Sequence, residues 1–230
     1  MKIHGLQKMT LLDFPGHVAC TVFLGGCDFR CPFCHNFELV DGTAKPVMDE
    51  EEFLSFLNKR AGLLDGVAFT GGEPLLHKDL PELMQKIRTL GFGVKLDTNG
   101  YHPNLLKEIL AAGLADYVAM DVKNSPEKYA MTAGVETIDL SRINESISVL
   151  MNSGIDYEFR TTVVKEFHEE NDFHRMGEMI RGAKRYFLQA FTDRETVPFG
   201  GLSAPSAEEM RAYAGIAAQY VPSVELRGVE

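Results

Sequence analysis

Short apolar runs of strand type alternate with helical patterns along nearly the whole chain, and this alternation limits the fold more than any other feature. The predicted strands are residues 18–24, 66–70, 93–98, 117–122, 157–164 and 185–191, with 223–226 as a candidate terminal strand. The predicted helices are residues 51–64, 80–90, 105–112, 143–151, 173–183 and 207–220. Each crossover helix returns the chain to the same end of the sheet, so we expect parallel strands and an α/β fold.

Six strand–helix units with almost continuously apolar strands indicate an open or closed α/β barrel. A flat doubly wound sheet is the alternative, because spacing alone does not separate the two topologies. The length of 230 residues suits a single domain spanning 1–230, with a core at about 16–191 and a C-terminal helix and strand at 206–228. In either topology, polar residues at the carboxyl ends of the strands form the candidate site.

The charge balance and the apolar runs exclude two classes of partner. Asp and Glu total 33 against 23 for Lys and Arg, and no run rich in Lys or Arg is present, so binding to nucleic acid is not expected. No apolar run reaches the roughly 18 to 20 residues that a membrane span needs, and the first residues lack the pattern of a signal peptide. We therefore expect a cytoplasmic protein that binds neither nucleic acid nor membrane.

All four cysteines lie between positions 20 and 34, which favours metal chemistry over a disulfide scaffold. Cys27, Cys31 and Cys34 follow the first strand at C-x-x-x-C-x-x-C spacing, so one loop can bring three thiolates to one centre. Thiolates suit iron–sulfur clusters, zinc or copper(I), and three ligands on a four-iron cluster leave one iron open. We predict Cys20 to be a small buried hydrophobic residue. The alternative for the triplet is a structural zinc site completed by Cys20 or His35.

Polar motifs also end the next three strands. Thr-Gly-Gly-Glu ends the second, where glycines let backbone approach a ligand and Glu73 can accept hydrogen bonds from a cation. Asp-Thr-Asn-Gly ends the third, although Asn-Gly by itself indicates only a turn. Asp121 and Lys123 end the fourth strand and share a face, because they are two residues apart.

Two histidines lie among acidic residues in a way that imitates a metal site. His168 and His174 flank Glu169, Glu170 and Asp172. The stretch is typical of a loop that enters a helix, so we predict that it faces solvent.

The cysteine loop resembles that of the radical S-adenosylmethionine (SAM) superfamily, and its surroundings resemble the branch of glycyl-radical-enzyme activases. Cys-Pro-Phe-Cys-His-Asn at 31–36 is similar to the activase cysteine loop. Gly-Leu-Gln-Lys-Met-Thr-Leu-Leu-Asp-Phe-Pro-Gly at 5–16 resembles the opening of anaerobic ribonucleoside-triphosphate reductase activating proteins. The resemblance extends to about Phe191. It implies a single-domain, partial (β/α)6 barrel of the radical SAM type, in which Cys27, Cys31 and Cys34 hold a [4Fe–4S] cluster.

The resemblance further implies which strand-end residues contact the cofactors. They are Gly71, Gly72, Glu73, Asp97, Thr98, Asp121, Lys123, Arg160 and Gln189. The glycines and the glutamate would hold the amino group of SAM, and the lysine would hold its carboxylate. The two aspartates and the threonine would bind a monovalent cation. The arginine would lie over SAM, with a structural role as the alternative, and the glutamine would contact SAM.

The activity that the resemblance implies is reductive cleavage of SAM to methionine and a 5′-deoxyadenosyl radical, with an electron from flavodoxin or ferredoxin. The radical would remove an α-hydrogen from a glycine of a partner, with anaerobic ribonucleotide reductase as the expected partner. Pyruvate formate-lyase activases carry a histidine near the position of Gln189, and its absence here argues against that substrate. The alternatives are another glycyl radical enzyme or a peptide as substrate and, in a different class, a non-catalytic iron–sulfur or zinc module.

Overall fold

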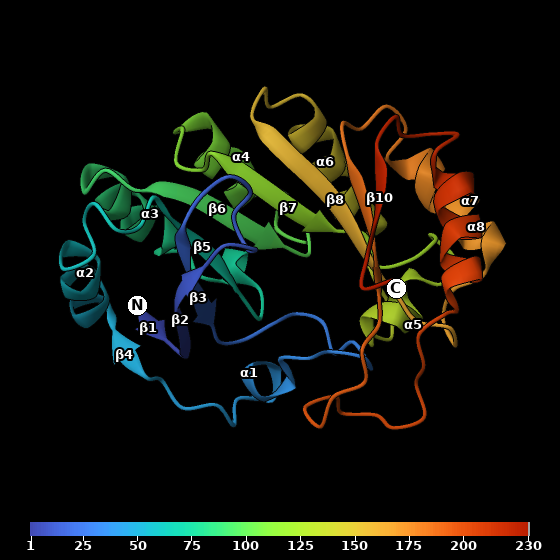
Figure 1. Ribbon diagram of the computed structural model, residues 1–230, viewed down its shortest axis with the longest axis horizontal. Helices are drawn as coiled ribbons and strands as arrows, with labels where there is room; N and C mark the ends of the chain where they lie inside the picture. The colour runs from blue at the N-terminus through green and yellow to red at the C-terminus, as the bar shows by residue number, and fades with distance from the viewer. Residues whose placement is uncertain (230) are drawn as a thin grey trace.

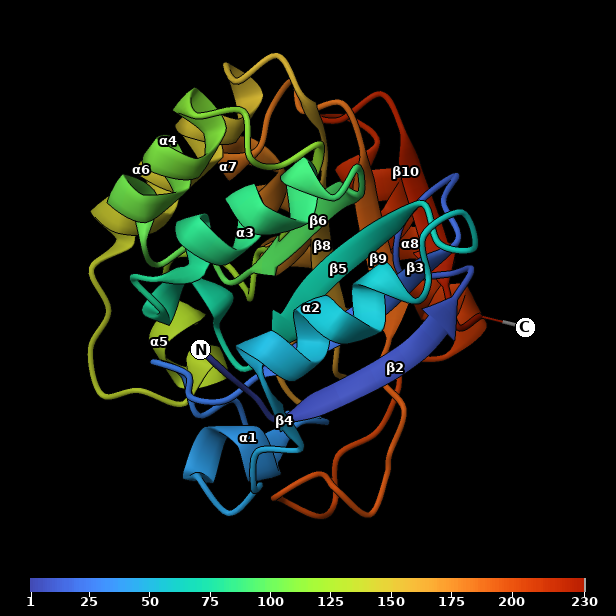
Figure 2. The same ribbon diagram turned by 90° about the vertical axis from the view of Figure 1, so that its left-hand side faces the viewer.

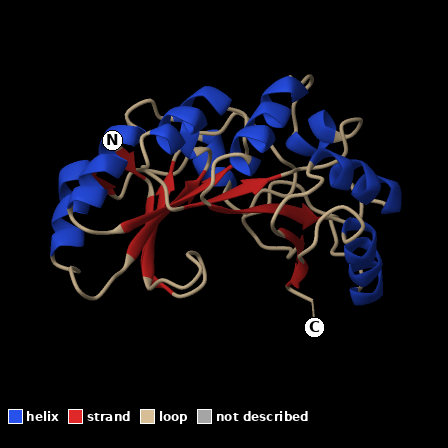
Figure 3. Cartoon of the chain, turned by 90° about the horizontal axis from the view of Figure 1, so that it is seen from above, coloured by secondary structure: helices blue, strands red, loops and turns tan. Residues whose placement is uncertain are grey.

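The computed structural model describes residues 1–229 and contains a curved sheet of eight strands with helices along its outer side (Figure 1, Figure 3). The strand order is β10-β9-β8-β7-β6-β5-β3-β2, and every neighbouring pair is parallel except β2 with β3. The strands are β2 (Gly5–Thr10), β3 (Ala19–Leu24), β5 (Gly66–Gly71), β6 (Gly93–Thr98), β7 (Tyr117–Asp121), β8 (Asp156–Val163), β9 (Tyr186–Ala190) and β10 (Val224–Arg227). Within residues 1–229 the outermost strands, β2 and β10, do not pair, so the barrel is open. The prediction of a partial α/β barrel is confirmed, and the flat doubly wound alternative is wrong.

Each predicted helix is present. The helices of this group are α2 (Glu50–Asn58), α3 (Leu80–Thr89), α4 (Pro103–Ala111), α6 (Leu140–Met151), α7 (Glu170–Met179) and α8 (Ala207–Ala217). Local signals define several beginnings: capping boxes start α2 and α8, and proline occupies the first turn of α3 and α4.

Several short elements were not predicted. They are β1 (Lys2–Ile3), β4 (Met48–Asp49), α1 (Phe37–Asp41), the 3₁₀ turn η1 (Pro74–Leu76), α5 (Tyr129–Ala133) and the edge strand β2. Figure 2 shows β2 at the near edge of the sheet. Its middle residues are exposed, so it lacks the apolar pattern by which the other strands were recognised.

The core strands are not continuously apolar but alternate between two faces. In β6, Val94 and Leu96 are fully buried in the main hydrophobic core, whereas Asp97 lines a cavity on the other face. Lys95 shares the face of Asp97 because strand residues two apart point the same way. The outer face therefore packs under the helices, and the inner face carries the polar side chains.

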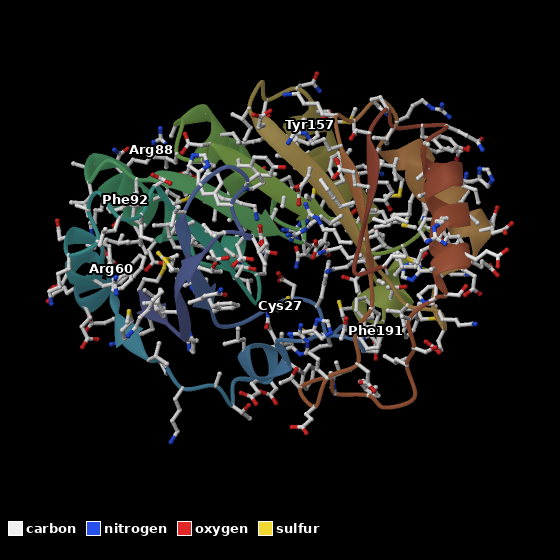
Figure 4. The ribbon with its side chains drawn as sticks, viewed as in Figure 1. Cys27, Arg60, Arg88, Phe92, Tyr157 and Phe191 are labelled. Carbon is white, nitrogen blue, oxygen red and sulfur yellow. The ribbon has the colours of Figure 1, made fainter. Side chains whose placement is uncertain are left out.

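The carboxyl ends of the parallel strands lie along one side of the molecule. In Figure 4, Cys27 and Phe191, which follow β3 and β9, lie in the middle and lower part of the view. Phe92 and Tyr157, near the starts of β6 and β8, lie at the opposite side. Among residues 1–229, no helix combines the length and apolar character required to cross a bilayer.

Candidate active site

One cavity of about 430 Å³ lies at the carboxyl ends of the strands. Its lining includes every residue predicted for the site except Glu73. The predicted residues that line it are Cys27, Cys31, Cys34, Gly71, Gly72, Asp97, Thr98, Asp121, Lys123, Arg160 and Gln189. Residues from the ends of five strands and from the cysteine loop thus meet at one place.

The cysteine loop follows β3 and is held by its own backbone and by a neighbouring turn. The Cys34 N–H donates to the Cys31 carbonyl at 3.1 Å. The Cys27 sulfur accepts from the Phe29 N–H at 3.4 Å and from the Asn99 side-chain amide at 3.8 Å. Asn99 belongs to the Asp-Thr-Asn-Gly turn, so this contact joins the loop to the end of β6.

Burial makes the three thiols harder to ionise in the absence of metal. It raises the pKa of Cys27 to about 12, with the charge of Glu73 adding to the effect, and the pKa of Cys31 to about 11. It also raises the pKa of Cys34, whereas the ammonium of Lys123 lowers the pKa of all three thiols. Binding of iron by the thiolates must therefore release protons.

The donor set fits an iron–sulfur cluster. Three soft thiol donors from one loop line one cavity, beside a cationic side chain that favours their ionised form. No three His, Cys, Asp or Glu side chains of residues 1–229 are grouped as a ready site for one bare metal ion.

The glycine pair after β5 allows a close approach of two backbone segments. Gly71 has a φ of 115°, and a Cβ there would lie 2.5 Å from the backbone of Leu24. A Cβ on Gly72 would lie 1.9 Å from the carbonyl oxygen of Gly26. The Gly72 N–H donates to the Leu24 carbonyl at 2.8 Å, and the Glu73 N–H donates to the Gly26 carbonyl at 2.7 Å. The glycines are therefore required by the chain itself; backbone contact with SAM stays a prediction.

Glu73 lies behind the wall of the cavity and is fully buried. Its carboxylate accepts from the Leu75 N–H at 3.0 Å, the Thr98 hydroxyl at 2.7 Å and the Asn99 N–H at 2.6 Å. Burial raises the pKa of Glu73 to about 7 in spite of these bonds. In this structure Glu73 connects the end of β5 to the end of β6, and its contact with SAM stays a prediction.

Five charged side chains form a continuous ionic cluster at the ends of β6, β7 and β8. Asp97 pairs with Lys95 and accepts from Arg160 Nη1 at 3.3 Å. Asp121 accepts from Arg160 Nε at 3.0 Å and from Lys123 Nζ at 2.9 Å. Burial alone would raise the pKa of Asp121, but the neighbouring cations outweigh it and lower the pKa to about 2. Lys95 was missed from the sequence, where a charged residue inside an otherwise apolar strand was its signal.

Two residues next to the cysteines attach the loop to other strand ends, and their roles were not predicted. His35 Nε2 lies 2.6 Å from the Thr192 carbonyl, and its ring stacks on Phe191 with 5.7 Å between centroids. The Asn36 side-chain amide donates to the Gly71 carbonyl at 3.1 Å. The loop is therefore held from both the β5 side and the β9 side.

The prediction that the stretch around His168 faces solvent is wrong for His168 and Asp172, although Glu169 and Glu170 are exposed as predicted. His168 is only 4% exposed; its Nδ1 lies 3.1 Å from the Val164 N–H, and its Nε2 lies 3.0 Å from the Lys123 carbonyl. Asp172 is also buried and accepts from the Ser125 hydroxyl at 2.7 Å. These side chains support the segment that carries Lys123.

Cys20 lies away from the cavity, in the hydrophobic core. It is fully buried and is a free cysteine of the core cluster. The prediction of a small buried hydrophobic residue is confirmed.

Comparison with known proteins identifies the family to which this chain belongs. The sequence pattern of the Radical SAM superfamily matches residues 21–178. A protein of Methanocaldococcus jannaschii, provisionally named as a glycyl-radical enzyme activating enzyme, is 30% identical over 237 residues, covering 99% of this chain and 96% of the relative. The pyruvate formate-lyase 1-activating enzyme of Escherichia coli K12 is 26% identical over 244 residues, covering 95% of this chain and 96% of that enzyme.

A solved structure supports the same assignment of the fold. Streptococcus suis SuiB bound to S-adenosylmethionine superposes with a TM-score of 0.67 at 13% identity, covering 90% of this chain and 52% of SuiB. Because the family pattern covers more than half of the chain and an activase relative matches it over nearly its full length, this chain belongs to the radical SAM superfamily, in the branch of glycyl-radical-enzyme activases that use a [4Fe–4S] cluster and SAM.

Proposed function

We propose that this enzyme generates a glycyl radical on a partner enzyme and that the partner is an anaerobic ribonucleoside-triphosphate reductase. The observation that carries the proposal is the match to activases over nearly the full length, in a chain whose cysteine triplet and strand-end residues line one cavity. The opening segment at 5–16 favours the reductase. Gln189 lines the cavity where pyruvate formate-lyase activases carry a nearby histidine, and this difference argues against pyruvate formate-lyase as the partner. The non-catalytic module is no longer an alternative, since the chain belongs to a family of enzymes.

Different residues of the cavity would contact the two cofactors. Cys27, Cys31 and Cys34 would hold three irons and leave the fourth open to the amino and carboxylate groups of SAM. Lys123 would meet the SAM carboxylate, and the backbone of Gly71 and Gly72 would meet the amino group. When bound, the cluster and SAM supply reductive cleavage of the sulfonium C–S bond, with one electron from an external donor such as flavodoxin or ferredoxin.

The other side chains orient this arrangement and hold its charge. Arg160 bridges Asp97 and Asp121 and so holds the ends of β6, β7 and β8 together. The carboxylate of Asp121 also orients Lys123. Gln189, which lines the cavity, would contact SAM from β9. The free thiols fit the reducing cytoplasm, which we propose as the compartment.

The test is transfer of hydrogen from the partner's glycine. The protein is reconstituted without oxygen and mixed with SAM, a reductant and the anaerobic ribonucleotide reductase of the same genome, its glycines carrying deuterium at the α-carbon. We expect a glycyl radical signal in electron paramagnetic resonance and deuterium in the 5′-deoxyadenosine. Cys31→Ala, which removes one cluster ligand, is expected to abolish both. A reductase whose radical-bearing glycine is replaced by alanine is the matched control.

The pyruvate formate-lyase of the same genome, where present, provides the competing arm. A radical on that enzyme and none on the reductase would overturn the choice of partner but keep the activase function. Formation of 5′-deoxyadenosine without deuterium from either enzyme would overturn glycyl radical formation itself and point to a peptide substrate.

A further inference from the structure

All four carboxylate oxygens of Asp97 and Asp121 already carry a cationic donor from the protein. On Asp97, Oδ1 pairs with the Lys95 ammonium and Oδ2 with Arg160 Nη1. On Asp121, Oδ1 pairs with Arg160 Nε and Oδ2 with Lys123 Nζ. Both aspartates were predicted, with Thr98, to bind a monovalent cation. A metal ion at these oxygens would therefore compete with donors that are in place.

The net charge of this ionic cluster also disfavours binding of a metal cation. Three protein cations meet two carboxylates, so the group carries one net positive charge beside the cavity. The exposed fraction is 3% for the Lys95 side chain and 15% for Arg160, so water screens these charges weakly. A further cation would add a second net charge in a poorly screened place, which is unfavourable.

The position of Lys95 in the sheet explains why its ammonium meets Asp97. Its neighbours at the same register level are Ala68 on β5 and Tyr117 on β7, neither of which offers a carboxylate. Alanine leaves room for the long side chain. The nearby Glu158 is already satisfied by the Tyr117 hydroxyl at 2.7 Å and by Arg227 at 3.0 Å. Asp97, two residues further along the same face, is the remaining carboxylate with which Lys95 can pair.

We propose that Lys95 is a built-in replacement for a monovalent metal cation, so that this enzyme binds SAM without one. Lys95 does not line the cavity and acts through Asp97, which orients Arg160 and, through Asp121, Lys123. It is a positioning residue. The proposal uses SAM binding, which belongs to the family, and does not depend on the identity of the partner enzyme.

The test compares salts at equal ionic strength. The dissociation constant of SAM is measured for the holoenzyme in potassium, sodium and choline chloride, because choline is too large to enter a carboxylate site. The unsubstituted enzyme is expected to bind SAM within about twofold in all three salts, a difference of less than 0.5 kcal/mol by the usual conversion. Lys95→Met leaves a buried carboxylate short of a partner, so it is expected to lose about tenfold or more in choline and to recover in potassium or sodium.

Two further variants separate this role from a general need for the side chain. Lys95→Arg keeps the charge and is expected to stay independent of the salt. Lys107→Met removes an ammonium from an exposed pair with Glu145 and is expected to match the unsubstituted enzyme. The thermal midpoint of each holoenzyme, measured in the same salts without SAM, is a second readout: only Lys95→Met is expected to be stabilised by potassium or sodium relative to choline.

The unsubstituted enzyme alone keeps the proposal falsifiable if Lys95→Met does not fold. A tenfold weaker affinity for SAM in choline than in potassium, in the unsubstituted enzyme, would overturn it and restore the metal cation. An affinity of Lys95→Met that is equally weak in all salts would also overturn it, because the vacated position would then not accept a cation.

Discussion

The two sides of the cavity are held by different kinds of interaction. On the side of β3 and β5, which we call the glycine wall (24–26 and 71–72), backbone segments lie so close that a single Cβ would reach 1.9 Å from a carbonyl oxygen. On the side of β6, β7 and β8, the ionic wall (Lys95, Asp97, Asp121, Lys123 and Arg160) is held by charged side chains. The glycine wall depends on the shape of closely packed backbone and the ionic wall on paired charges. Each wall should therefore be destabilised by a different kind of substitution.

The largest loss of stability is expected from Arg160→Met in the ionic wall. The substitution leaves Asp97 and Asp121 each with one cationic partner fewer in a poorly solvated place, which costs about 3 to 5 kcal/mol in the free energy of unfolding. Denaturant unfolding measures it. Arg175→Met is the matched control, because Arg175 also bridges two carboxylates, those of Glu127 and Glu178, but at the surface. Equal losses from the two variants would contradict the importance of burial.

Gly72→Ala is the corresponding substitution in the glycine wall and is expected to cost about 3 kcal/mol, because the backbone of Gly26 must move. Iron content after reconstitution should fall as well, since the displaced segment leads into the cysteine loop. Gly200→Ala has nothing within 4 Å of its new Cβ and should change the stability by less than about 0.5 kcal/mol. A tolerated Gly72→Ala would show that the glycine wall is not fixed by shape.

The pH dependence of stability should also separate the two sides. Glu73, beside the glycine wall, has a folded pKa raised from 4.5 to about 7, so the folded state holds a proton that the unfolded state has released. Stability therefore falls as the pH rises from about 4.5 to about 7, by on the order of 3 kcal/mol. Asp121, with a pKa lowered from 3.8 to about 2, stabilises the fold above pH 3.8 and loses this contribution as the pH falls toward 2.

Glu73→Gln is the variant that isolates the first effect. It has no carboxyl group to titrate, so the difference in unfolding free energy between it and the unsubstituted protein should change across pH 4.5 to 7. Thermal midpoints at closely spaced pH values measure this difference. A constant difference would mean that Glu73 is ionised throughout, held so by its three hydrogen bonds.

The elements that could be predicted from the sequence are those with a repeating apolar pattern. Six strands and six helices were found because each buries one face over enough residues to show a period, and the candidate terminal strand at 223–226 is present as β10 (Val224–Arg227). The edge strand β2 carries exposed Gln7, Lys8 and Met9, and the five-residue helices α1 and α5 are too short for periodicity, so all three were missed.

The site was predictable where its residues end a strand, as Asp121 does, or lie just after one, as Cys27 does. It was not predictable where a residue inside a strand pairs with a site residue, as Lys95 does with Asp97. It was also not predictable where a loop residue packs under another segment of the site, as His168 does at the Lys123 carbonyl. The sequence also did not show which way the Glu73 side chain points. The positive φ of Gly71 interrupts the two-residue alternation of β5, so the alternation does not continue to Glu73. Such contacts depend on neighbouring strands, which one sequence pattern does not describe.

The smallest expected effect concerns a side-chain contact between Asp28 of the cysteine loop and His102, the residue before α4. His102 Nε2 lies 2.7 Å from Asp28, and both side chains are about a quarter exposed. Because the loop is also held by its backbone and by the side chains of His35, Asn36 and Asn99, Asp28→Asn should cost less than about 1 kcal/mol and leave the iron content unchanged. Thermal midpoint and iron per chain are the measurements. A loss as large as that of Gly72→Ala would show that charge as well as shape holds the loop, and the contrast between the two sides of the cavity would no longer apply.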